Sequence, residues 1–175
     1  MHTLPDIRFR ALEPRDIDTL YEAENDSAAW VSSETVAPYS RHTLASYIES
    51  TVSDPVKEGQ LRLIAEDAAT GSTVGILDFY EYSLRHRRSF VGVYTLTKYR
   101  KQGYGEAMVR EADRYAAEWL GCELLAARIL ADNEESLRLF ERCGYSRCAT
   151  LGGWHYASGR RHDVLILTRH LSRTA

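Results

Sequence analysis

The sequence has few cysteines and prolines, no long apolar run and no excess of positive charge. Its three cysteines form no Cys-x-x-Cys pair, which argues against a zinc site and favours free thiols in a reducing compartment. No apolar stretch reaches the roughly 20 residues that a membrane helix needs, and the first residues, MHTLPDIRFR, do not resemble a signal peptide. The formal net charge of -3 argues against general affinity for nucleic acid. We therefore expect a cytoplasmic protein with no metal, no membrane association and no nucleic-acid partner.

The composition is that of an ordinary globular protein, with 44% hydrophobic and 27% charged residues. A chain of 175 residues is long enough to enclose one hydrophobic core, so we expect a single domain over residues 1–175. Periodicity alone does not separate an exposed apolar stripe from the core, and a homo-oligomer therefore stays open.

Apolar periodicity predicts a mixed sheet with helices on both faces, an α/β or α+β arrangement. The segment at 25–40, rich in Ser and Ala, is predicted to be an irregular connection of the kind that often lines a site. The predicted elements in order are a strand at 7–12, helices at 16–24 and 40–51, strands at 60–67, 72–83 and 89–96, a helix at 105–120, a strand at 122–130, a helix at 133–144, and a closing hairpin of strands at 145–156 and 160–170.

The stretch TKYRKQGYG, at 97–105, connects a predicted strand directly to a predicted helix. The first N–H groups of a helix have no partner within it, and they attract anions. Gly103 and Gly105 lack the Cβ atoms that would keep a phosphate at a distance, while Arg100 and Lys101 add positive charge. A Walker loop is excluded because no Lys-Ser or Lys-Thr follows, and a dinucleotide fingerprint is excluded because Met108 stands in the place of its last glycine. The loop is nevertheless predicted to bind a phosphate group.

Arg100, Gly103 and Gly105 form an Arg-x-x-Gly-x-Gly pattern, and LLAARIL and ADNEESLRLFERCGY follow it. Together these segments resemble the GCN5-related N-acetyltransferase (GNAT) superfamily, and the similarity extends over nearly the whole chain. Within the superfamily the sequence is most similar to the branch of spermidine and ribosomal-protein N-acetyltransferases. The resemblance implies a mostly antiparallel sheet of about seven strands, in which one parallel pair splays apart to form a cleft for acetyl-CoA.

The resemblance also implies which residues bind the donor. The diphosphate would be held by the loop, the pantetheine arm would pair with the strand before it, and Asn133 would contact coenzyme A or cap its helix. A backbone N–H of that strand would stabilise the oxyanion of the tetrahedral intermediate. The predicted donor-binding residues are Val93, Tyr94, Thr95, Arg100, Lys101, Gln102, Gly103, Tyr104, Gly105, Glu106, Asn133, Ser136 and Phe140.

Two positions depart from the family pattern. Phe140 stands where this branch commonly has a tyrosine that acts as the general acid, and Phe90 stands where the spermidine enzymes carry a glutamate. The acceptor amine must lose a proton before it attacks, since an alkylammonium has a pKa of about 10.4. Glu81 and Tyr94 are the predicted catalytic residues, and Asp78 is a further candidate base.

Acidic and aromatic residues suggest the acceptor. Glu22, Asp26, Trp30 and Glu34, together with Glu81, would form an acidic wall for a polyamine, although charged residues on two helices are also commonly exposed to solvent. We expect transfer of an acetyl group to a primary amine, with a small polyamine or diamine such as spermidine as the first acceptor. A protein N-terminus, an aminoglycoside or an amino sugar is the alternative, and an acyl-CoA sensor without activity is an alternative of another class.

Overall fold

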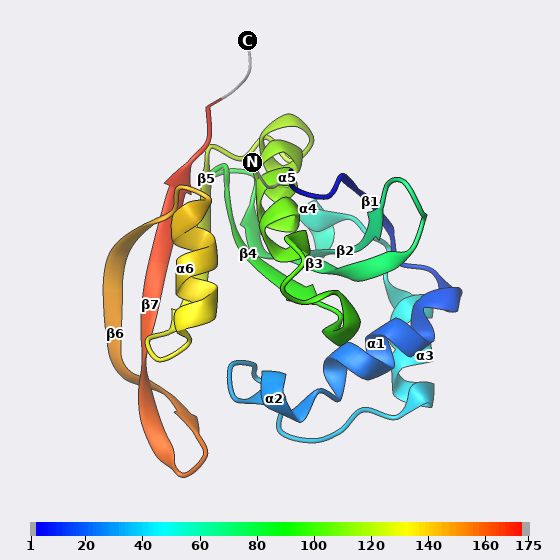
Figure 1. Ribbon diagram of the computed structural model, residues 1–175, viewed down its shortest axis with the longest axis horizontal. Coiled ribbons are helices and arrows are strands. Elements are labelled where there is room, and N and C mark those ends of the chain that lie inside the picture. Colours follow the sequence, from blue (N-terminus) through cyan, green and yellow to red (C-terminus); the bar gives the residue numbers. More distant parts are fainter. Residues whose placement is uncertain (1–2, 173–175) are drawn as a thin grey trace.

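The computed structural model describes residues 3–172, which form a seven-stranded sheet covered by helices (Figure 1). Two short 3-10 turns, at Pro14–Asp16 and Thr97–Tyr99, precede α1 and the loop before α5. The strands are β1 (Ile7–Ala11), β2 (Leu61–Asp67), β3 (Thr73–Ser83), β4 (Arg88–Thr95), β5 (Leu124–Leu130), β6 (Ser146–Ala157) and β7 (Arg160–His170). The helices are α1 (Ile17–Glu24), α2 (Ser27–Trp30), α3 (Arg41–Ser50), α4 (Pro55–Glu58), α5 (Tyr104–Glu118) and α6 (Glu134–Arg142).

The sheet has the strand order β1-β2-β3-β4-β5-β7-β6, and every neighbouring pair is antiparallel except β4 and β5. This confirms the predicted fold of a mixed, mostly antiparallel sheet with one parallel pair. The parallel pairing is short, because only 88–90 of β4 pairs with 124–126 of β5. Beyond that point the two strands no longer share a ladder.

Alternate residues of the central strands face two separate cores. Leu77 and Phe79 of β3 pack with Val91 of β4 beneath α5 and α6. Ile76, which points to the other face of β3, packs with Leu20 of α1 and with residues of α3. All of these side chains are almost fully buried, and each contributes about 1.5–3 kcal/mol through removal of its apolar surface from water. The two faces of the sheet are therefore both covered, and they stay distinct along β3 and β4.

The predicted helices and strands lie where the patterns indicate, and the differences are at short elements. The predicted connection at 25–40 contains α2, whose N-terminus is capped by Asp26 through a bond from the Ala28 N–H. α4 was not predicted, since four residues are too few to show a helical period. Asp54 starts α4 by accepting hydrogen bonds from the N–H groups of Val56 and Lys57.

Two ion-pair clusters fix the ends of the sheet. Arg10 of β1 donates to both carboxylate oxygens of buried Asp16, each at 2.7 Å, and to Glu66 of β2 at 2.5 Å. Burial alone would raise the pKa of Asp16, but the Arg10 hydrogen bonds lower it below its usual range. At the other end, Asp113 of α5 accepts a bond from the Tyr145 hydroxyl at 2.7 Å and forms an ion pair with Arg169 at 2.9 Å.

Within residues 3–172, no helix is long and apolar enough to span a bilayer, and no three His, Cys, Asp or Glu side chains gather as a metal site would require. Cys122, Cys143 and Cys148 are free thiols, the first two of them buried.

Candidate active site

The separation of β4 from β5 opens a cavity of about 630 Å³ in the middle of the sheet. Val91, Gly92, Val93 and Tyr94 line one side, and 127–130 of β5 lines the other. Because β4 continues to pair with β3 as far as Thr95, its backbone stays extended while its other edge has no strand partner there. An extended chain such as a pantetheine arm can pair with such an edge. Two of the predicted donor-binding residues, Val93 and Tyr94, thus lie at the predicted cleft.

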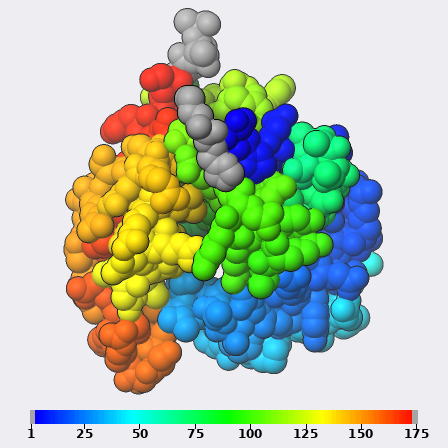
Figure 2. All heavy atoms as spheres, in the orientation of Figure 1, coloured from blue at the N-terminus to red at the C-terminus, as the bar shows by residue number. Residues whose placement is uncertain are grey.

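A second cavity, of about 580 Å³, lies between the glycine loop and α6. The surface is hollowed between the segment that carries the loop and α6, coloured green and yellow in Figure 2. The two cavities adjoin along β4, since Thr95 lines the second and its neighbour Tyr94 lines the first. The second cavity is lined by Thr95, Arg100, Lys101, Gly103, Gly105, Glu106, Glu134, Glu135, Arg138, Leu139 and Arg142.

α5 begins at this second cavity with an uncovered N-terminus. Gly103 is its N-cap, at φ 88°, and no side chain caps the helix. Its conformation favours glycine, and a Cβ on Gly103 would lie in tight contact with Leu4 at 3.3 Å and Pro5 at 3.2 Å. A Cβ on Gly105 would stand beside Leu139 and Thr95 in the cavity wall. The first N–H groups of α5 are therefore available to an anion, as the loop pattern predicts.

The side chains of the loop are less free than its backbone. Arg100 forms an ion pair with Asp26 at 2.8 Å and donates to the Thr95 carbonyl at 3.1 Å. Tyr104 donates its hydroxyl proton to Asp67, and Gln102 donates to the Lys98 carbonyl. Tyr104 and Gln102 do not line the cavity, so they offer a ligand only their backbone N–H groups.

α6 presents one face to the central cavity. Asn133 caps this helix by accepting a bond from the Ser136 N–H at 3.1 Å, and both residues line the cavity with Phe140. Phe140 is almost fully buried and packs edge to face on Tyr145, with ring centroids 5.0 Å apart. Tyr145 does not replace the missing acid, because its hydroxyl is bonded to Asp113 and burial raises its pKa strongly.

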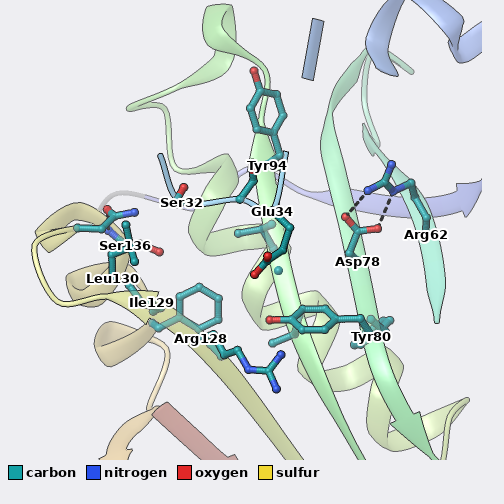
Figure 3. A pocket seen from close by; sticks show the side chains of 18 of the residues that line it. Ser32, Glu34, Arg62, Asp78, Tyr80, Tyr94, Arg128, Ile129, Leu130 and Ser136 are labelled. Carbon is teal, nitrogen blue, oxygen red and sulfur yellow. Dashed lines mark hydrogen bonds and ion pairs between the residues drawn. The ribbon is translucent and has the colours of Figure 1, made fainter. Parts of the chain in front are cut away.

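The opposite wall of the central cavity is polar. Asp78 and Tyr80 of β3 and Arg128 of β5 alternate with core residues, and they therefore face the side of the sheet that α1 and α3 cover. Glu34, from the connection after α2, points into the same cavity (Figure 3). Burial raises the pKa of the Tyr80 phenol to about 12. This wall therefore offers carboxylates to an amine and a guanidinium to an anionic group of the same ligand.

Tyr94 lies in the cavity wall but is not placed to accept a proton. Its hydroxyl donates to Asp26 at 2.9 Å. Burial, and then this bond to a carboxylate, raises the pKa of Tyr94 to about 12. The phenol thus holds its proton at neutral pH, and the geometry gives no support to the predicted role of Tyr94 as a base.

Glu81 lies outside the cavity. It occupies a bulge in β3 at φ 49°, where the register with β4 shifts, and its carboxylate forms an ion pair with Arg128 at 2.6 Å. Its side chain is half exposed and does not line the central cavity. The predicted catalytic and acceptor-binding roles of Glu81 therefore have no support in the geometry.

The predicted acidic wall is not assembled as one surface. Glu22 accepts a bond from the Thr97 N–H, and Asp26 is engaged by Arg100 and Tyr94. The Arg100 bond is the main reason that the pKa of Asp26 is lowered. The Trp30 indole donates to a backbone carbonyl at 2.7 Å. Of these predicted residues only Glu34 lines the central cavity, and it makes no hydrogen bond or ion pair with other described residues.

Several residues of the central cavity were not predicted from the sequence, among them four with large polar side chains. A weak signal existed for Arg128, since it is the only charged residue in the apolar strand LLAARIL. Arg62 pairs across β2 and β3 with Asp78, a contact that becomes evident only once the strand register is known. These four large polar residues are Tyr47, Arg62, Tyr80 and Arg128.

Comparison with known proteins identifies the family. A model of the acetyltransferase (GNAT) domain matches residues 6–146. A putative phosphinothricin acetyltransferase of Bacillus subtilis is 28% identical over 170 residues, which cover 94% of this chain and 99% of the relative. The spermidine N(1)-acetyltransferase of Vibrio cholerae is 20% identical over 117 residues, which cover 65% of this chain and 67% of the relative.

A solved structure of spermidine N-acetyltransferase from Vibrio cholerae, in complex with CoA and spermine, has the same fold. It matches 95% of this chain and 96% of its own with a TM-score of 0.83 and 20% sequence identity. These findings confirm the predicted superfamily and fold, and with them an N-acetyltransferase that uses acetyl-CoA as its donor. The chain belongs to the GNAT acetyltransferase family.

Proposed function

We propose that this enzyme transfers an acetyl group from acetyl-CoA to the primary amine of a small molecule held against the polar wall of the central cavity. The observation that carries the proposal is the arrangement of two cavities along β4. The glycine loop opens on one of them, and the unpaired edge of β4 and Glu34 open on the other. A donor that spans both would bring its thioester beside β4 and within reach of an acceptor.

The chemistry then follows from the residues in the central cavity. Glu34 accepts a proton from the acceptor ammonium, and the neutral nitrogen attacks the thioester carbonyl carbon. A backbone N–H on the free edge of β4 stabilises the resulting oxyanion. The C–S bond breaks when the intermediate collapses, and the proton that the nitrogen gained in excess passes to the departing sulfur or to water. The thiolate is a tolerable leaving group because the pKa of a thiol is about 8.5. The proposed chemistry therefore needs no tyrosine at position 140.

Glu34 is a better candidate base than Asp78. Both carboxylate oxygens of Asp78 accept hydrogen bonds from Arg62, at 2.7 and 3.0 Å, so neither oxygen is free to face an acceptor ammonium. Glu34 has no such partner among the described residues, and it points into the cavity.

The test of this proposal is a matched pair of variants, Glu34→Gln and Glu22→Gln. Loss of a positioned base typically costs about 10²–10⁴-fold, so Glu34→Gln should lower kcat/KM by at least about 100-fold. Glu22 lies outside the cavity, and its variant should behave like the wild type. Release of free CoA across a panel of primary amines is the measurement. Equal activity of the two variants would remove Glu34 from the mechanism.

A polyamine is the acceptor favoured by the sequence, and it should be assayed first. The similarity to spermidine acetyltransferases and the placement of Glu34 support it. Against it stands the charge of the cavity, where Arg62 and Arg128 balance Glu34 and Asp78. The free thiols support the prediction that the reaction takes place in a reducing compartment such as the cytoplasm.

A peptide N-terminus is a second candidate, because a groove leads to the central cavity. This groove, of about 500 Å³, runs between the connection at 27–36 and the hairpin of β6 and β7. It shares Ser33 and Glu34 with the central cavity, and Trp30 and Trp154 line it. A peptide lying in the groove would present its terminal amine at Glu34. Acetylation of short peptides in preference to free amines would support this alternative.

A further inference from the structure

Arg128 is fixed at the polar wall by aromatic stacking. It lies in the part of β5 that has separated from β4, and its guanidinium stands 4.0 Å above the ring of Phe90 and 5.8 Å from that of Tyr80. The two rings are themselves stacked, with centroids 5.4 Å apart. A cation over an aromatic face is attracted to it, and this contact holds the guanidinium of Arg128 at the polar wall.

The guanidinium of Arg128 still has capacity to bind an anion. Its ion pair with Glu81 uses Nη1 only, and no other hydrogen bond links its side chain to the described residues. An arginine has five N–H donors in a fork that matches a carboxylate. Because the side chains of Arg128 and Glu81 are 38% and 50% exposed, their ion pair is weak and an incoming anion can share or replace it.

Arg62, the other cation of the central cavity, is engaged by more carboxylates. Its Nε and Nη2 bind both oxygens of Asp78, and its Nη1 binds Glu24 at 2.5 Å. These three bonds engage all three side-chain nitrogens of Arg62 with carboxylates, and they leave two of its five N–H donors. Arg128 makes one such bond and Arg62 makes three, so Arg128 is the cation of this cavity with more donors left for a ligand.

The anion that Arg128 receives is not the diphosphate of the donor. The cavity at the glycine loop and the central cavity have no lining residue in common, and Arg128 lines only the central one. Arg128 also faces the polar wall, with Asp78 and Tyr80, whereas the donor-binding residues of α6 lie on the other side of the cavity. An anion at Arg128 therefore belongs to the acceptor.

We propose that the acceptor carries an anionic group close to its amine, as an α-amino acid does, and that Arg128 binds this group while Glu34 faces the ammonium. This inference rests on the proposed function, since it specifies the acceptor of the same site. A cavity with a receptive cation and an unpaired carboxylate is complementary to a zwitterion. It is unfavourable for a polycation, whose second ammonium would meet the Arg128 guanidinium.

The test uses pairs of acceptors that differ only in the anion, namely α-amino acids and the amines formed by replacing their carboxylate with hydrogen. The ratio of kcat/KM for acid over amine is measured in the wild type and in Arg128→Met. Comparing the two ratios cancels the difference in amine pKa between the acceptors. Loss of a charge-assisted bidentate contact should lower the ratio by about 10- to 100-fold, with the KM for acetyl-CoA unchanged.

Arg147→Met is the matched control, because Arg147 of β6 is also a strand arginine paired with one glutamate, at 2.7 Å, but lies outside the cavity. Its ratio should equal that of the wild type. Arg128→Lys keeps the positive charge but lacks the guanidinium N–H donors, so it should give an intermediate ratio. This variant replaces Arg128→Met in the test if the Met variant does not fold. An unchanged ratio in Arg128→Met or Arg128→Lys, or a wild type that prefers polyamines, overturns the inference alone. Failure to acetylate any amine of either class overturns the proposed function as well.

Discussion

Replacing Gly105 with alanine should change stability and donor binding in opposite directions. Gly105 is the second residue of α5, where alanine is favoured over glycine by up to about 0.5–1 kcal/mol. The added Cβ would lie 3.4 Å from Leu139 and 3.5 Å from Thr95, which are ordinary contacts. The variant should therefore be at least as stable as the wild type.

The same methyl group occupies the cavity in front of the first N–H groups of α5. A phosphate would have to withdraw and lose about one charge-assisted hydrogen bond, worth about 1.5–3 kcal/mol. This corresponds to a Kd for CoA that is about 10- to 100-fold higher. Calorimetric titration with CoA and thermal unfolding measure the two effects separately.

Gly152→Ala is the control, because Gly152 lies in β6 and a Cβ there would meet no atom within 4 Å. Its Kd for CoA should equal that of the wild type. Titration with pantetheine, which lacks the diphosphate, should show little difference between Gly105→Ala and the wild type. The reasoning is refuted if Gly105→Ala binds CoA as tightly as the wild type does.

Three further predictions concern stability and catalysis. Arg10 lowers the pKa of Asp16, so the Asp16 carboxylate stabilises the folded state above its unfolded pKa of about 3.9, and this stabilisation is lost as the pH falls through the lower folded pKa. Denaturant titrations at several pH values should therefore show that the free energy of unfolding falls less steeply with acid in Asp16→Asn than in the wild type. An identical fall would contradict this. Arg169→Leu leaves the buried Asp113 carboxylate without its cation and should cost about 3–5 kcal/mol in urea unfolding, and a loss below about 1 kcal/mol would count against the ion pair. Phe140→Tyr adds a phenol at the cavity edge and should raise kcat if protonation of the thiolate limits turnover, whereas an unchanged kcat in pre-steady-state assays would show that it does not.

Much of the fold could be predicted because its elements carry strong periodic signals. Apolar residues at alternate positions around Leu77 and Phe79 indicate that one face of β3 is buried. Apolar residues spaced three and four apart in α5 indicate the face that packs on the sheet. α2 and α4 are set instead by single caps, Asp26 and Asp54, which also occur in ordinary turns. Short capped helices of this kind leave no period for a sequence pattern to reveal.

The two halves of the site differ in how well they could be predicted. The donor loop lies within one continuous stretch, so its glycines and its helix could be identified together. The acceptor wall combines β2, β3, β5 and the connection after α2, and its composition depends on which acids are already engaged. Asp26 is bound by Tyr94, 68 positions away, and no local pattern could indicate that contact. The sequence therefore could not indicate which of the predicted acids face the central cavity.

The central claim is that the donor diphosphate is held by backbone N–H groups where α5 begins. Amide NMR spectra recorded during titration with CoA test it most directly. The account predicts the largest shift changes at Gly103, Tyr104 and Gly105, and much smaller changes at these amides with pantetheine. Amides at these positions that do not respond to saturating CoA, with the main changes elsewhere in the chain, would contradict it.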